Sequence, residues 1–153
     1  MAKAKTKDET ALYLNRIIQA PREKVFQAWV DPRALTQWFA PSEHMTTTVH
    51  AQDLRVGGRY RFEMRDPDGK SHIVIGEYRE IDAPARLVFT WAWESEQAED
   101  TQETLVTLLF RDQGKATEML LTHERFPSER SRELHNQGWT GCLARLEQLL
   151  ASG

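Results

Sequence analysis

Apolar residues recur with two different spacings along this chain, and the changes of spacing predict its elements. Residues 11–20 alternate between apolar and polar positions, which is typical of a strand. Pro21 suits the first turn of a helix, because its fixed φ already has a helical value. The residues that follow have helical spacing, with apolar positions at Val25, Phe26, Trp29 and Val30.

Two prolines bound a second short helix. Asp31 and Pro32 end the first helix and begin the next one, which we expect to continue to residue 40. Pro41 ends it, because a proline inside a helix removes a hydrogen bond and clashes with the preceding turn. The apolar edge of this helix consists of Leu35, Trp38 and Phe39.

Period-two alternation prevails from residue 46 to residue 125 and predicts about six strands. Glycine and aspartate mark turns at Gly57-Gly58, at residues 66–70 and at residues 111–115. The alternation is strictest in one strand, at Leu87, Phe89, Trp91 and Trp93.

The last element is predicted as a long helix from Ser128 to Leu150, with Ser128 as its N-cap. Its apolar stripe comprises His135, Trp139, Cys142, Leu143, Leu146, Leu149 and Leu150. Gly138 and Gly141 lie beside Trp139, although each glycine costs a helix interior about 1 kcal/mol relative to alanine. We expect these glycines to let a strand, the short helices or a ligand approach the helix backbone closely.

The order of elements is a strand, two short helices, about six strands and one long helix. This order predicts an α+β fold with an antiparallel sheet and the helices gathered on one side. A chain of 153 residues is long enough for one domain with a proper core. We expect a single domain over residues 11–153, after a disordered and lysine-rich tail at residues 1–10.

Composition and charge narrow the function classes. A net charge of −3 and a pI near 6.0 argue against nucleic acid or an anionic membrane surface as partners, because both attract a basic surplus. No apolar run approaches the roughly 20 residues of a membrane span, and the N-terminus lacks the apolar core of a secretory signal. We therefore expect no membrane insertion and a cytoplasmic location, which suits a chain whose one cysteine is Cys142.

Metal, cofactor and nucleophile motifs do not occur in the sequence. The five histidines, at His44, His50, His72, His123 and His135, show no metal-ligand spacing. No glycine-rich nucleotide-binding motif is present, so we expect neither a metal nor a cofactor. Cys142 and His135 share a helix face but lie about 10.5 Å apart along its axis, too far for the roughly 3 Å of a thiolate–imidazole pair.

His123 is the most ambiguous polar candidate. It precedes Glu124 on a strand, so the two side chains point to opposite faces of the sheet. If His123 faces the long helix, it shares the interior with Met119 and Leu121. There it can orient a ligand, or it can form a hydrogen bond within a packed core, which is the plainer interpretation.

Several longer stretches carry a family resemblance: RIIQAPREKVFQAWVDPRALTQWFAP, LRVGGRYRFEMRDPDG, GEYREIDAPARLVFTWAW, LTHERFP and HNQGWTGCLARLEQLL. In their order and spacing they resemble the activator of heat-shock-protein-90 ATPase homologue-like family. That family belongs to the START-like, or polyketide cyclase/dehydrase and lipid-transport, superfamily. The resemblance implies a helix-grip fold, in which a curved antiparallel sheet of six or seven strands wraps the long C-terminal helix. Two short helices after the first strand close one end.

The resemblance also implies an apolar cavity between the sheet and the C-terminal helix. We therefore expect a binding protein, without established catalysis, that holds a small apolar or aromatic molecule. Trp38 and Phe39 are expected at the mouth of this cavity. The residues expected to bind the ligand are Trp38, Phe39, Phe62, Met64, Phe89, Trp91, Trp93, Met119, Leu121, His123, His135, Trp139 and Leu143.

Two alternatives stay open. One is an enzyme of the cyclase or hydrolase type that uses His123 or His135 as a general base in the same cavity. The other is a chaperone-binding or protein-interaction module, which would present an exposed apolar patch. The sequence leaves the oligomeric state open, a homodimer included.

Overall fold

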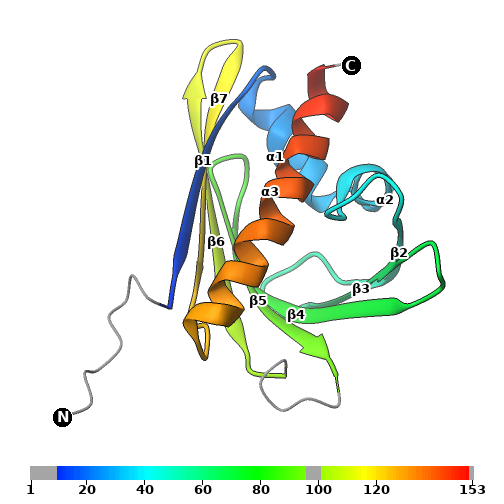
Figure 1. The fold of residues 1–153 in the computed structure, drawn as a ribbon. Coiled ribbons are helices and arrows are strands. Elements are labelled where there is room, and N and C mark those ends of the chain that lie inside the picture. Colours follow the sequence, from blue (N-terminus) through cyan, green and yellow to red (C-terminus); the bar gives the residue numbers. More distant parts are fainter. Residues whose placement is uncertain (1–9, 96–100, 152–153) are drawn as a thin grey trace.

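A computed structural model describes residues 10–95 and 101–151, and Figure 1 shows how they fold. Within these residues, seven strands form one antiparallel sheet in the order β1-β7-β6-β5-β4-β3-β2. The strands are β1 (Leu12–Ile18), β2 (Thr46–Gln52), β3 (Arg59–Arg65), β4 (Ser71–Asp82), β5 (Arg86–Glu94), β6 (Thr104–Gln113) and β7 (Ala116–Glu124).

Three helices lie against the concave side of this sheet. They are α1 (Arg22–Val30), α2 (Pro32–Trp38) and α3 (Glu129–Ala151). The sheet curves around α3, and α1 and α2 lie at the end of the molecule where α3 finishes (Figure 1). The predicted α+β, helix-grip arrangement is confirmed.

Side-chain caps start two of the helices, and the cap at Ser128 is the predicted one. The Asp31 carboxylate accepts the backbone N–H of Arg33 at 2.9 Å and caps α2. The Ser128 hydroxyl accepts the backbone N–H of Ser131 at 3.1 Å and caps α3. Helix α2 ends at Trp38, two residues before the predicted bound of 40, because Phe39 leaves helical geometry.

Two irregularities accompany the curvature of the sheet. The register shifts between Val49 and Ala51 in β2, and between Tyr78 and Glu80 in β4. Such bulges bend a strand and increase its twist. The sheet therefore turns towards α3 at β2, β3 and β4 instead of continuing flat.

The packed core fills the end of the molecule that α1 and α2 cover. The Trp38 indole is fully buried and donates its N–H to the Ala28 carbonyl at 2.9 Å, which ties α2 to α1. Its ring meets that of Trp29 edge to face, with centroids 4.7 Å apart. From α3, Leu143 and Leu146 are fully buried in the same cluster.

Some expectations fall outside what the structure describes. The predicted disordered tail at residues 1–10 lies outside the described residues except for Thr10. The single domain over residues 11–153 stays a prediction. No helix in the described part of the chain has both the length and the apolar character that crossing a membrane requires.

The two glycines of α3 have different surroundings. A Cβ atom on Gly141 would lie 2.2 Å from the carbonyl oxygen of Pro41, so only glycine fits this contact between α3 and the loop after α2. Arg145, one turn further along, donates to the carbonyls of Gln37 at 2.9 Å and Ser42 at 3.3 Å. A Cβ on Gly138 would meet nothing within 4 Å. Close approach of a neighbouring segment therefore explains Gly141, whereas Gly138 borders open space.

Gly141→Ala is expected to lower the free energy of unfolding by about 1–3 kcal/mol, because the added methyl group would overlap a backbone oxygen. Gly138→Ala is the matched control and should raise it by up to about 1 kcal/mol, since it gains helix propensity and meets no neighbour. Urea unfolding followed by tryptophan fluorescence measures both values. Equal effects of the two substitutions would contradict the close-approach account of Gly141.

Candidate functional site

A pocket of about 710 Å³ opens between the N-terminal half of α3, the loop after α2, and strands β3, β4 and β5. This volume lies in the range of about 300–1,000 Å³ that is typical of small-molecule sites. Its inner wall, as we define it, is formed by Phe39, Met45, Met64, Trp91, Trp93, His135, Gly138, Trp139 and Cys142. Its mouth is formed by the more exposed residues Asp66, Lys70, Ser71, His72, Glu94, Ser95 and Leu134.

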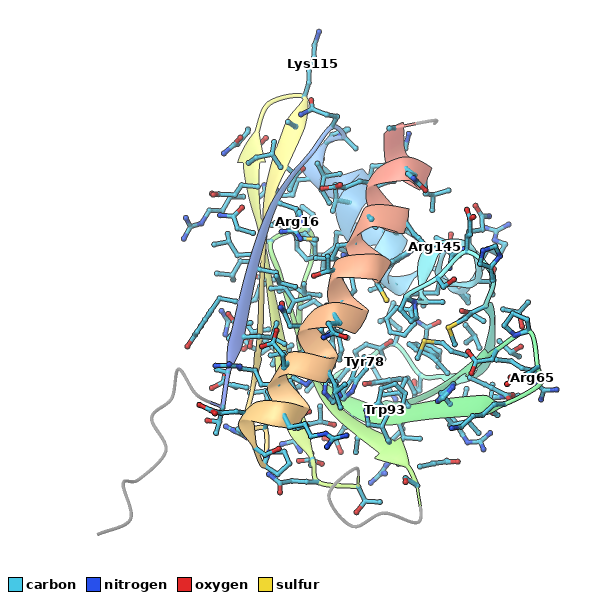
Figure 2. The ribbon with its side chains drawn as sticks, in the orientation of Figure 1. Arg16, Arg65, Tyr78, Trp93, Lys115 and Arg145 are labelled. Carbon is cyan, nitrogen blue, oxygen red and sulfur yellow. The ribbon has the colours of Figure 1, made fainter. Side chains whose placement is uncertain are left out.

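Strand register brings the inner wall together. Met64 of β3 pairs with His72 of β4, and Val74 of β4 pairs with Trp93 of β5. Because side chains alternate along each strand, Met64 and Trp93 both point towards α3. In Figure 2, Trp93 lies beneath the N-terminal half of α3, whereas Arg145 lies near α2. At Gly138 the helix backbone itself forms part of the pocket wall, because no side chain intervenes.

His135 holds Trp93 in this wall. The Trp93 indole N–H donates to Nε2 of His135 at 2.9 Å. Since an indole N–H can only donate, Nε2 is the unprotonated ring nitrogen. Nδ1 of His135 therefore carries the proton and donates to the Ser131 carbonyl of the same helix at 2.7 Å. Both nitrogens of this neutral imidazole are used within the protein.

His123 holds Trp139 in the same way from the opposite side. The Trp139 indole N–H donates to Nδ1 of His123 at 3.0 Å, so the proton of this imidazole lies on Nε2. Nε2 donates to the Thr104 hydroxyl at 2.7 Å, and Thr104 donates to the Trp91 carbonyl at 2.9 Å. Every polar group in this series of buried hydrogen bonds thus has a partner. This confirms the interpretation of His123 as a hydrogen-bonded histidine of the core.

Burial sets the protonation of two groups near the pocket. Burial lowers the pKa of His123 well below its ordinary value, so the ring is neutral at physiological pH. Burial also raises the pKa of the Cys142 thiol to about 12. Cys142 is therefore a protonated thiol in the inner wall and not a thiolate nucleophile.

The acidic side chains at the mouth are already paired. Asp66 meets Nε2 of His72 at 3.0 Å. Glu94 accepts two hydrogen bonds from the Arg61 guanidinium, at 2.8 and 3.0 Å. Among the described residues, no group of three or more His, Cys, Asp or Glu side chains is placed to hold a metal ion.

The structure brings together only some of the predicted ligand-binding residues. Those in the inner wall are Phe39, Met64, Trp91, Trp93, His135 and Trp139. The others are buried elsewhere in the core, namely Trp38, Phe62, Phe89, Met119, Leu121, His123 and Leu143. Trp38, expected at the mouth, is fully buried between α1 and α2, while Phe39 reaches the inner wall.

Other pocket residues were not among the predicted ones. Lys70, Ser71 and His72 come from the turn between β3 and β4 and the strand start that follows it. Pro41 and Met45 come from the loop after α2. Turn and loop residues carry no apolar period, so periodicity gives no signal for them. Gly138 was the available sequence signal for the pocket. A glycine inside a helix, where it costs stability, indicates that the helix surface at that position borders a neighbour or open space.

Comparison with known proteins relates the chain to one family and one fold. The family model described as "Activator of Hsp90 ATPase homolog 1-like protein" matches residues 19–151. A Chromobacterium violaceum protein of known structure is similar at 27% identity, with a TM-score of 0.84, over 92% of this chain and 96% of that one. The AHSA1 protein of Silicibacter pomeroyi is similar at 25% identity, with a TM-score of 0.80, over 92% and 97% of the two chains. The comparison with curated proteins found no match.

His123→Gln is expected to flatten the pH dependence of stability between pH 5 and about 6.5. Below about 6.5 the unfolded chain binds a proton at His123 that the folded chain does not bind, because burial lowers its pKa. In the wild-type chain this lowers the free energy of unfolding by up to about 1.4 kcal/mol per pH unit as the pH falls. Urea unfolding at several pH values measures the slope.

The difference between wild type and His123→Gln should therefore shrink as the pH falls from 8 to 5. Glu63 does not disturb this range, because hydrogen bonds from Ser71, His50 and Arg65 lower its pKa to about 2. The stability that Glu63 contributes is lost only as the pH falls below about 4.5 towards 2. A difference that stays constant from pH 8 to pH 5 would contradict the neutral, buried state of His123.

Proposed function

The chain belongs to the activator of Hsp90 ATPase homolog 1-like family, and we propose that it binds a small apolar or aromatic molecule in the pocket beside α3. The observation that carries this proposal is the inner wall, where buried aromatic rings contact one another and also border open volume. Phe39, Trp91 and Trp139 are each at least 95% buried, yet all three line the pocket. Apolar walls with a few polar groups at the opening are typical of small-molecule sites.

The proposed mechanism is burial and shape, without chemistry on the ligand. A two-ring aromatic molecule that buries about 250 Å² of apolar surface gains about 6 kcal/mol at about 25 cal/mol per Å². Because association also costs translational and rotational freedom, this gain sets the tightest expected dissociation constant at some tens of micromolar. Aromatic ligands gain further from edge-to-face or offset contacts with rings such as Trp93 and Trp139. Ligand screens should therefore reach concentrations near 1 mM.

The alternative of a cyclase or hydrolase receives less support from the geometry. A general base needs a free lone pair within about 3 Å of the proton that it removes. The lone pair of His135 accepts from Trp93, and that of His123 accepts from Trp139. Cys142 is a protonated thiol with a raised pKa. For either imidazole to act as a base, the hydrogen bond that it accepts from Trp93 or Trp139 would first have to break.

The alternative of an interaction module also lacks a supporting feature. The exposed large apolar residues among those described are Tyr13, Ile17, Leu54, Val56 and Leu134. They lie on β1, in the loop after β2, and at the pocket mouth, so they belong to different parts of the chain. Singly exposed apolar residues are normal on soluble proteins.

Thermal unfolding with a panel of naphthols, fatty acids and polyketide-like phenols tests the proposed function. A compound at about 100 times its dissociation constant should add about 2.7 kcal/mol of stability, which raises the melting temperature by about 5–10 °C. Gly138→Leu should weaken binding of the active compounds at least tenfold, because the leucine side chain extends into the pocket. Gly138→Ala is the matched control and should bind within about threefold of wild type. If no compound stabilises the wild-type chain, the proposal fails.

A further inference from the structure

His135 lines the pocket, yet both of its ring nitrogens bond to the protein itself. We propose that His135 is a positioning residue that accepts the Trp93 indole N–H and so makes the inner wall apolar. As a consequence, the pocket selects aromatic molecules that are polar at one end only. This inference rests on the proposed function and deepens it, because it names the ligand class. It also assigns His135 a role that acts through Trp93 instead of through a direct hydrogen bond to the ligand.

The first step is the state of the Trp93 donor. Trp93 is only partly buried and lines the pocket beside His135, with the two ring centroids 6.0 Å apart. Its N–H points to Nε2 of His135 at 2.9 Å. Without an acceptor at position 135, this N–H would be an unpaired donor in the wall. An unpaired donor favours ligands that carry an acceptor at their buried end.

The second step is the rigidity of the acceptor. The His135 ring is held by its bond to the Ser131 carbonyl, one turn earlier on α3. It also packs against Phe126 and His123, with centroid distances of 4.8 and 5.3 Å. The acceptor is therefore fixed in place before any ligand enters, and it fixes the plane of the Trp93 indole in turn.

The third step concerns the other donors of the inner wall. The Trp139 N–H is taken by His123. The Trp91 N–H has no hydrogen-bond partner among the described residues, but it is covered by other atoms and not open to solvent. The side chains with accessible polar groups, such as Lys70 and Ser71, lie at the mouth.

The selected ligand class follows from this separation. A hydroxyl or carboxyl group pushed against the inner wall would lose its water without gaining a partner, which costs binding. The same group at the mouth keeps its water or meets Lys70 and Ser71. The pocket should therefore prefer a naphthalene-like molecule with one polar end over an isomer or derivative that is polar at both ends.

Calorimetric titration with 2-naphthol and 2,6-dihydroxynaphthalene tests this preference. The second compound differs by one hydroxyl at the far end of the ring system. The wild-type chain should bind it about tenfold more weakly than 2-naphthol, since one hydrogen bond to water is lost without replacement. In His135→Phe the freed Trp93 N–H can donate to the second hydroxyl of 2,6-dihydroxynaphthalene. The ratio of the two dissociation constants should therefore fall to about threefold or less. His135→Gln keeps an acceptor oxygen and should restore most of the wild-type ratio.

An experiment without ligand separates this inference from the proposed function. The indole N–H resonances are recorded by ¹H–¹⁵N NMR, and Trp93→Phe identifies the signal of Trp93. That signal should shift strongly in His135→Phe and much less in His135→Gln. The signal of Trp38, whose N–H donates to Ala28, serves as the internal reference and should not move.

The outcomes are distinguishable. An unchanged Trp93 signal in His135→Phe, or a naphthol ratio that is the same in His135→Phe as in wild type, overturns the role of His135. If neither naphthol binds the wild-type chain, the aromatic form of the proposed function and the ligand preference both fail. In that case the NMR result still decides whether His135 holds Trp93.

Discussion

The contact between Gly141 and the Pro41 carbonyl sets the position of α3, and most other features depend on that position. A helix can come this close to a loop only where no Cβ intervenes, and Arg145 then bonds to two further carbonyls of the same segment. The C-terminal half of α3 is thereby pressed onto α1 and α2, where Leu143 and Leu146 seal the core. The backbone of the N-terminal half stays away from β3, β4 and β5, although the side chains of His135 and Trp139 reach β5, and the pocket is the space that remains between them.

The inner wall is apolar because the indole N–H groups of Trp93 and Trp139 are bonded within the protein and that of Trp91 is covered by other atoms. Two tryptophans of the inner wall donate to two histidines, and each histidine donates its own N–H to a further acceptor. Buried polar groups are costly without partners, so these chains fix ring orientations as well as removing donors from the surface. Large aromatic side chains can thus line a cavity without making it a polar one.

Periodicity sufficed for the order of elements, because alternation and helical spacing directly reflect which face of each element is buried. Ser128 was recognisable as a cap, because capping depends on a single side chain and its local backbone, whereas Asp31 was recognised only as a helix boundary. The site was predictable only in part. Alternation identifies Phe89 and Trp91 equally as inward-facing, but only Trp91 reaches the pocket. The difference arises from where α3 docks, and that depends on contacts between segments about a hundred residues apart in the chain, such as the bond from Arg145 to Gln37.

The spacing of the two glycines divides α3 into segments under different constraints. Gly141 and the residues after it contact the loop and the core, so their substitution changes folding. A Cβ atom on Gly138 would meet nothing within 4 Å, and Leu134 before it is exposed at the mouth. Effects of substitutions that share no contacts are usually additive. We therefore expect a library restricted to positions 134 and 138 to change the shape of the pocket while the scaffold keeps its stability, which would make this helix a starting point for engineering small-molecule binding.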